Sequence, residues 1–189
     1  MSSPHFAKKL AQTENRIVRL ILQAYPGQPI SYWATGATAW TGITTAISAS
    51  GSSTKNFDAI LWHQGESNGD GYGPCITDDC YRDSLYNLIA RFNATTWVDN
   101  TTKFIAGGLS VNGTTGHKGR EDVLIELNSD TLTYTGFADA YGFTAGDVHF
   151  TNTELVEFGS VRYWNAYKAL PVLKYESTGS GGGTTNNTY

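Results

Sequence analysis

Apolar residues along this chain alternate between short continuous runs and stretches with helical spacing. The short runs, bounded by turn residues, predict strands over residues 16–24, 57–62, 103–109 and 133–141. The helical pattern and its capping signals predict helices that open at Ser3-Pro4, span 40–50, follow Asp78 or Asp79, span 120–127, and run from the capping box Thr151–Glu154 towards Leu170. Strands that alternate with helices in this way favour a parallel sheet covered on both faces.

In a parallel sheet, catalytic and ligand-binding residues usually lie in the loops at the carboxyl ends of the strands. The order of the predicted elements places four loops at that edge, at residues 25–30, 63–68, 110–116 and 145–150. Reactive side chains of a functional site are therefore expected in these loops.

Composition narrows the class of protein. The chain has 189 residues, of which 16% are charged, and a net charge of −4. It contains no basic run, which argues against a nucleic-acid partner. No apolar stretch approaches the roughly 20 residues of a membrane span, and the first residues lack a signal-peptide pattern.

The length predicts one domain over residues 1–175, followed by a flexible tail over 176–189 that is rich in Gly, Ser, Thr and Asn. The two cysteines, Cys75 and Cys80, flank a short loop. We predict a local disulfide between them, with two partly buried free thiols as the alternative. A disulfide would favour a location outside the cytosol.

Three of the four loops at the predicted edge carry hydrolase-like chemistry. Asp147 and His149 form an Asp-x-His pair, in which the carboxylate could orient the imidazole as a general base. The side-chain amide of Gln64 and the backbone N–H of Gly27 could donate to an oxyanion. A structural role for the Asp-x-His pair, and a strand-capping role for His63, remain open at this level. His117 has no carboxylate beside it in the sequence, and we predict it at the surface.

Three blocks of the chain are similar to the SGNH-hydrolase superfamily, and in particular to its sialate O-acetylesterase and acetylxylan esterase branch. The most specific block is Trp-His-Gln-Gly-Glu-Ser at 62–67, which follows a predicted strand. The opening stretch, from SPHFAKKLAQ to PGQPISYW, and the closing stretch DVHFTNTELVEFGSVRYWNAY also resemble the family. The resemblance covers roughly residues 3–170.

The resemblance implies a role for each matching residue. His149 would be the general base, Asp147 its orienting acid, and Gly27 and Gln64 the oxyanion-hole donors. The resemblance further implies that Glu66 braces the loop and that His63 lines the site. The fold it implies is a three-layer α/β sandwich of SGNH or flavodoxin-like type.

Two departures from the family pattern matter. The acid of the family usually lies three residues before the histidine, whereas Asp147 lies two before His149. The nucleophilic serine of the family follows a first strand that has no counterpart here, so the sheet is expected to lack that strand. Ser67 follows a strand too, and it is the alternative nucleophile, although it also fits as the ordinary end of its block.

These observations lead to a carbohydrate O-acetylesterase, with a catalytically degenerate glycan-binding or structural module, such as part of a virion appendage, as the alternative. We expect an acetylated carbohydrate as partner, no nucleic acid, no membrane, no cofactor and no metal. A further polypeptide segment is expected to supply the first strand and the serine. The expected location is extracellular or virion-associated.

Overall fold

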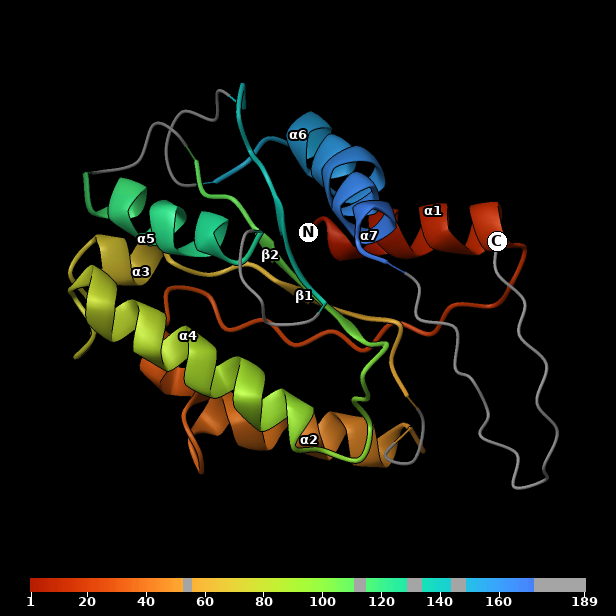
Figure 1. Ribbon diagram of the computed structural model, residues 1–189, viewed down its shortest axis with the longest axis horizontal. Coiled ribbons are helices and arrows are strands. Elements are labelled where there is room, and N and C mark those ends of the chain that lie inside the picture. The colour runs from red at the N-terminus through yellow and green to blue at the C-terminus, as the bar shows by residue number, and fades with distance from the viewer. Residues whose placement is uncertain (53–55, 111–114, 129–133, 144–148, 172–189) are drawn as a thin grey trace, which may run out of the picture.

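A three-stranded parallel sheet forms the centre of the fold (Figure 1). The computed structural model describes residues 1–52, 56–110, 115–128, 134–143 and 149–171. The strands are β1 (Ala59–Trp62), β2 (Lys103–Gly107) and β3 (Thr135–Ala138), in the order β1-β2-β3. Ala59 is in register with Lys103, and Phe104 with Thr135, so all three strands point the same way.

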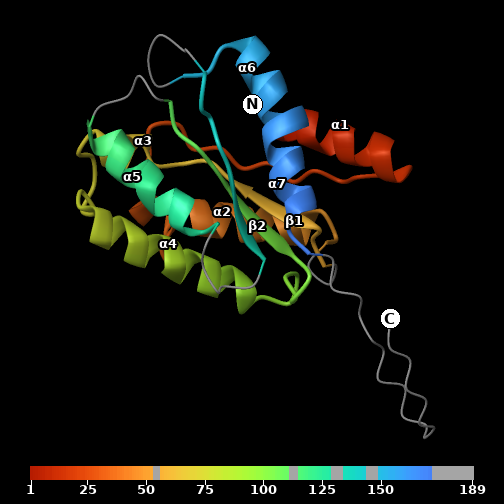
Figure 2. The same cartoon turned by 45° about the horizontal axis from the view of Figure 1, so that its top comes forward.

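Helices cover both faces of the sheet, as Figures 1 and 2 show. One face packs against α1 (Ser3–Glu14) and a C-terminal helical stretch, which consists of α6 (Asn152–Glu157), the π-helical turn η2 (Phe158–Tyr163) and α7 (Trp164–Ala169). The other face packs against α2 (Thr38–Ala49), α4 (Asp78–Asn93) and α5 (Thr115–Glu126). The predicted three-layer α/β sandwich with a parallel sheet is confirmed.

Two short helices follow the loops at one edge of the sheet. The 3-10 helix η1 (Ile30–Trp33) follows the turn at Pro26 and Gly27, and α3 (Glu66–Gly69) follows β1 after three residues. Both were treated as loop in the sequence, because four residues are too few to show helical periodicity.

Most of the predicted helices and strands are present, with shifted ends. The capping box is confirmed: Thr151 Oγ1 accepts the N–H of Glu154, whose carboxylate accepts the N–H of Thr151. The N-cap of α4 is Thr77 rather than Asp78 or Asp79, and its hydroxyl oxygen accepts the N–H of Cys80 at 3.3 Å. α5 begins earlier than predicted, and the proposed tail at 176–189 lies outside the described residues.

The predicted strand over residues 16–24 is wrong. This segment runs without regular structure, and Ile17 is 96% exposed. A strand requires a neighbouring strand to pair with, and within the described part of the chain the backbone of residues 17–24 forms no hydrogen bond. The run is apolar, as predicted, but the described residues include no strand that pairs with it.

The disulfide between Cys75 and Cys80 is present, which confirms that prediction. Ser84 of α4 lies 3.2 Å from the Cys75 sulfur. The disulfide joins the loop before α4 to the first turn of that helix.

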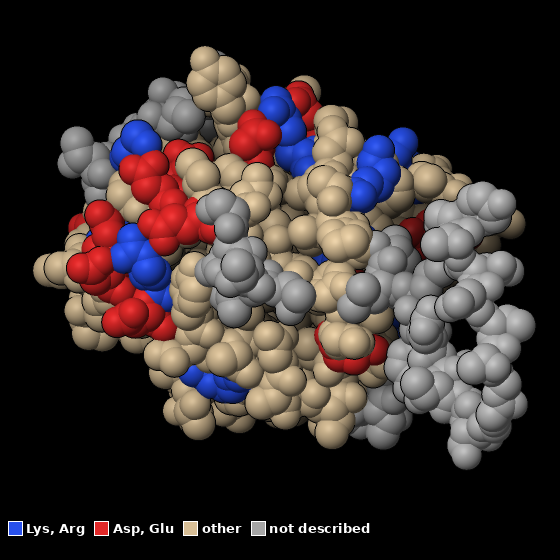
Figure 3. Space-filling view, in the orientation of Figure 1, with Lys and Arg blue, Asp and Glu red and all other residues tan. Residues whose placement is uncertain are grey.

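Charged side chains on the face shown in Figure 3 alternate in sign over α4 and α5. Arg82 pairs with Glu126 at 2.7 Å, and Lys118 pairs with Asp122 at 2.5 Å. Charges paired in this way produce no positive field of the kind a polyanion requires. Among the described residues, no helix has both the length and the apolar character needed to cross a bilayer.

Candidate active site

The loop that leaves β1 is held in a tight conformation by Gly65. Its φ is +154°, and a Cβ at this position would lie 2.8 Å from the Leu109 side chain. Glycine is therefore required here both for the backbone angle and for the close packing. The chain therefore turns sharply after Trp62, His63 and Gln64 and enters α3.

Gln64 brings the end of β1 to the turn that contains Gly27. Its side-chain Nε2 donates to the carbonyl oxygen of Gln28 at 3.3 Å and to Asn68 Oδ1 at 2.8 Å. Gly27 itself is exposed, with φ of +67°. The two residues predicted as oxyanion donors therefore lie in loops that are in direct contact.

Asn68, which sequence reasoning missed, holds these loops together. It is 1% exposed, and its Oδ1 accepts both Gln64 Nε2 and the N–H of Ile30, the latter at 2.8 Å. Its Nδ2 donates to the carbonyl of Cys75 at 2.8 Å. A buried carboxamide with three partners fixes the positions of three separate loops. The available signal was its place four residues after Gln64, directly behind the Trp-His-Gln-Gly-Glu-Ser block.

Two buried tyrosines fix the carbonyl groups of the same loop. Tyr81 donates its hydroxyl hydrogen to the carbonyl oxygen of Gln64 at 2.7 Å, and Tyr163 donates to that of Trp62 at 2.8 Å. Burial raises the pKa of both phenols above the usual value. Both therefore remain protonated donors at physiological pH.

His63 lies between a carboxylate and two aromatic rings. Its Nε2 is 3.4 Å from Glu66 Oε1. The imidazole stacks on Phe150 with ring centroids 5.5 Å apart and meets Phe158 edge-on at 5.4 Å. Since Phe150 directly follows His149, the stack brings the C-terminal loop beside the end of β1.

The structure gives fewer contacts for the other residues predicted for the site, which are His149, Asp147 and Ser67. His149 is exposed, and its proposed partner Asp147 lies outside the described residues. Ser67 is half-buried in α3, and its carbonyl accepts the N–H of Tyr72 at 2.8 Å. Within the described residues, no hydrogen bond joins the Ser67 hydroxyl to an imidazole.

The prediction that His117 lies at the surface is wrong. Its side chain is 2% exposed, and Nε2 is 2.9 Å from Asp70 Oδ1. The pair joins α5 to the end of α3. Sequence spacing did not reveal it because 47 positions separate the partners.

Aromatic rings gather beside the turn at Pro26 and Gly27. Trp33 meets Trp62 edge-on at 5.2 Å and Tyr25 at 5.8 Å, and Tyr25 meets Tyr32 at 5.4 Å. Trp62 is 5% exposed and serves as core packing. The other three rings are half-buried, so each keeps accessible surface at this edge.

The described side chains include no group of three or more His, Cys, Asp or Glu arranged to hold a metal ion. The chemistry available from the side chains present is imidazole–carboxylate proton transfer and hydrogen bonding from amides.

Parallel strands between two layers of helices define a three-layer α/β sandwich. The chain belongs to the carbohydrate esterase family of sialic acid-specific acetylesterases, whose model matches residues 2–169. It is also similar to a protein from Arabidopsis thaliana of known crystal structure, with 20% identity and a TM-score of 0.71. The similarity covers 86% of this chain and 66% of the plant protein. Because the identity is only 20%, it supports the fold alone. No curated protein matches the chain in sequence.

Proposed function

We propose that this chain forms most of a carbohydrate O-acetylesterase that removes acetyl groups from acetylated sugars such as sialic acids. The observation that carries the proposal is the meeting of three loops around His63 and Gln64. Gln64 contacts the turn of Gly27, and His63 stacks on the residue after His149. The family model, which matches residues 2–169, supports ester hydrolysis as the reaction.

In the proposed mechanism, a serine hydroxyl attacks the acetyl carbonyl while His149 takes its proton. The carbonyl oxygen becomes an oxyanion, to which the Gly27 N–H and the Gln64 Nε2 donate. The intermediate collapses to an acetyl-serine, and the departing sugar oxygen takes the proton from His149. Water, deprotonated by His149, then attacks the acetyl-serine, which releases acetate and restores the serine.

The supporting residues have separate proposed roles. Asp147 orients His149, Glu66 holds His63 at the wall of the site, and the half-buried rings of Tyr25, Tyr32 and Trp33 offer faces for a sugar. Accessible aromatic faces are suited to the apolar faces of pyranose rings.

The proposed nucleophile comes from a further polypeptide segment. The chain spans 66% of the length of the plant protein of the same fold, which leaves a third of that protein without a counterpart here. Ser67 is the alternative nucleophile within the chain.

One observation favours the competing function, a glycan-binding module without turnover. Both hydrogens of Gln64 Nε2 already have acceptors, at Gln28 and Asn68. Before Gln64 can stabilise an oxyanion, the longer bond to the Gln28 carbonyl must be exchanged. In a module without turnover, the same bond serves only to hold the loops.

Acetate release from an O-acetylated sialic acid tests the proposal. The 189-residue chain alone is expected to turn over slowly or not at all, and adding a serine-bearing segment is expected to raise the rate by orders of magnitude. Good activity from the chain alone that is lost in Ser67→Ala would instead identify Ser67 as the nucleophile. Binding of the acetylated sugar without turnover, even with the added segment, would support the competing function.

We further propose an extracellular or virion-associated location. The disulfide supports it, because such bonds persist in oxidising environments.

A further inference from the structure

The disulfide between Cys75 and Cys80 lies beside two hydrogen bonds that hold the side chain and the main chain of Gln64. At the side chain, Gln64 Nε2 donates to Asn68 Oδ1 at 2.8 Å, and Asn68 Nδ2 donates to the Cys75 carbonyl at 2.8 Å. At the main chain, Tyr81, which directly follows Cys80, donates its hydroxyl hydrogen to the Gln64 carbonyl at 2.7 Å. Each cysteine is therefore one short connection away from the proposed oxyanion donor.

The loop that contains Cys75 has few other attachments. Among the described residues, the backbone of 73–76 forms no hydrogen bond with another backbone group. Gly73, with φ of +82°, lies against Pro29, and the carbonyl of Ile76 accepts a hydrogen bond from Arg120. Segments with so few backbone hydrogen bonds open at a low free-energy cost. The position of the Cys75 carbonyl therefore depends on the disulfide.

The helix at the other end of the disulfide is firmly packed. Tyr81 and Leu85 are both 0% exposed in the core. Thr77 caps the first turn of α4 and accepts the N–H of Cys80 at 3.3 Å. The disulfide thus transmits the fixed position of α4 to the loop before it.

Ser84 makes the Cys75 sulfur a suitable leaving group for thiol–disulfide exchange. A disulfide sulfur carries no hydrogen, so the Ser84 hydroxyl is the donor in its 3.2 Å contact with Cys75 Sγ. Cys75 is 7% exposed, whereas Cys80 is half-buried, so an entering thiolate reaches the Cys80 sulfur more readily. The electron pair of the S–S bond then passes to the Cys75 sulfur, where the Ser84 hydroxyl stabilises the thiolate.

We propose that the disulfide between Cys75 and Cys80 positions Gln64 as the oxyanion donor, so that this part of the site is fixed in the oxidised protein and loosened on reduction. The inference rests on the proposed function, which gives Gln64 its chemical role. Both cysteines are positioning residues, since they act through Asn68 and Tyr81. An esterase of this kind reaches full activity only in an oxidising environment, which agrees with the proposed location.

Reduction by a dithiol such as dithiothreitol proceeds through a mixed disulfide with Cys80. One thiolate of the dithiol attacks the Cys80 sulfur, and Cys75 leaves as a thiolate that takes up a proton. The second thiolate then attacks the sulfur of the reagent, which releases Cys80 and closes a cyclic disulfide. Two electrons and two protons pass to the protein in this way, and a small-molecule disulfide such as oxidised glutathione reverses the change.

The side-chain amide of Gln64 reports on the coupling in the 189-residue chain itself. The glutamines are Gln12, Gln23, Gln28 and Gln64, so selective ¹⁵N labelling of glutamine side chains gives a simple spectrum. Gln23 is the matched control, because its Nε2 also donates to a carbonyl at 3.3 Å, but to that of Gly42 in α2. On reduction, hydrogen exchange at Gln64 Nε2 should become about tenfold faster or more, and exchange at Gln23 should stay within about twofold.

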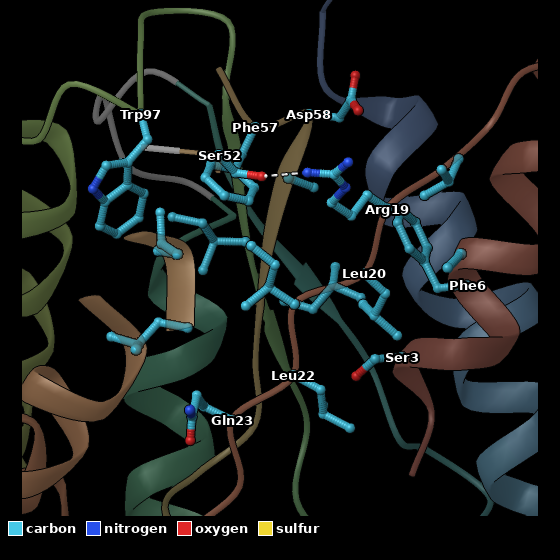
Figure 4. Close-up of a pocket in the computed structure, with 18 of the residues that line it drawn as sticks. Ser3, Phe6, Arg19, Leu20, Leu22, Gln23, Ser52, Phe57, Asp58 and Trp97 are labelled. Carbon is cyan, nitrogen blue, oxygen red and sulfur yellow. Dashed lines mark hydrogen bonds between the residues drawn. The ribbon is translucent and has the colours of Figure 1, made fainter. Parts of the chain in front are cut away.

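A packing variant separates this effect from a general loss of stability. Phe57 precedes β1 and Gln64 follows it, so the two residues lie at opposite ends of this strand. Phe57 meets Trp97 edge-on at 5.5 Å beside a cavity of about 360 Å³, which Figure 4 shows. Phe57→Leu should lower the Tm, as reduction does, yet leave exchange at Gln64 within about twofold of the native rate.

Acetate release from the chain assembled with a serine-bearing segment tests the positioning role. Reduction should lower kcat about tenfold or more and change KM less than about threefold, because an oxyanion donor acts in the transition state. Oxidised glutathione should restore kcat. The double variant Cys75→Ser/Cys80→Ser should match the reduced enzyme and respond to neither reagent, whereas Phe57→Leu should keep the native kcat within about twofold.

Several results would overturn the inference. Unchanged exchange at Gln64 after reduction would reject the coupling, and an equal increase at Gln23 or in Phe57→Leu would show a general loosening of the fold instead. A fall in kcat on reduction that the double variant does not reproduce would place the redox effect in the added segment. Faster exchange at Gln64 with no acetate release from either form would confirm that the disulfide fixes Gln64 and reject the proposed function instead.

Discussion

The carboxamide oxygen of Asn68 accepts the backbone N–H of Ile30 at 2.8 Å, across 38 positions of sequence. The same oxygen accepts Gln64, and the amide nitrogen donates to Cys75. One side chain thus joins the end of β1, the turn before η1 and the disulfide loop. The positions of the predicted oxyanion donors depend on this junction.

Asn68→Ala is expected to destabilise the protein by about 2–4 kcal/mol, because a buried N–H at Ile30 and a carbonyl at Cys75 lose their partner. Urea unfolding followed by tryptophan fluorescence measures the change. Asn165→Ala is the matched control, because Asn165 is exposed on α7, and it is expected to change stability by less than about 0.5 kcal/mol. Equal effects of the two substitutions would contradict the role of Asn68.

His149 and His63 are expected to respond differently to substitution in the chain assembled with a serine-bearing segment. His149→Ala removes the proposed base and should lower acetate release about 100-fold or more. His63→Ala removes a ring stacked on Phe150 and should lower it about tenfold, by loosening the loop. Steady-state rates of acetate release measure both.

A larger loss in His63→Ala than in His149→Ala would assign the base to His63, whose carboxylate neighbour is Glu66. Glu66→Gln then provides the discriminating variant. It should have little effect if Glu66 only braces the loop, because an amide can still hydrogen-bond to the imidazole.

How far the sequence predicts this structure depends on the range of each interaction. The longer helices and the strands β1, β2 and β3 were predictable, since periodicity and capping act within one turn or a few residues. The absence of a strand over 16–24 was not predictable, because an apolar run becomes a strand only where another strand pairs with it. Asn68 and His117 were missed for a related reason, since Ile30 and Asp70, with which they pair, lie far away in sequence.

Removal of the disulfide is expected to lower stability by about 2 kcal/mol, as estimated from the chain entropy of a six-residue loop. The double variant Cys75→Ala/Cys80→Ala and the reduced native protein should show the same decrease in thermal unfolding. Intact mass after alkylation without reductant checks the bond itself. Two alkylated thiols in the native protein would contradict the disulfide.

Asp99 is expected to make stability depend on pH in the acidic range. Burial disfavours its charge, but hydrogen bonds from Thr101 and Thr102 outweigh this effect, and the pKa of Asp99 lies below its usual value. Its Oδ1 accepts the Thr101 N–H at 2.8 Å and the Thr101 hydroxyl at 2.7 Å. A carboxylate whose pKa is lower in the folded state stabilises the fold above its unfolded pKa, and this contribution is lost as the pH falls through the folded pKa.

Asp99→Ala should therefore reduce the free energy of unfolding by about 1 kcal/mol at pH 7, and the difference from the native protein should shrink as the pH falls below 3.8, the ordinary value for this carboxyl. Urea unfolding between pH 2.5 and pH 7 measures the trend. Asp83→Ala provides the control, since Asp83 is exposed on α4, and its effect should stay below about 0.5 kcal/mol throughout. A loss in Asp99→Ala that stays constant with pH would show that packing, rather than the charge on the carboxylate, holds this turn.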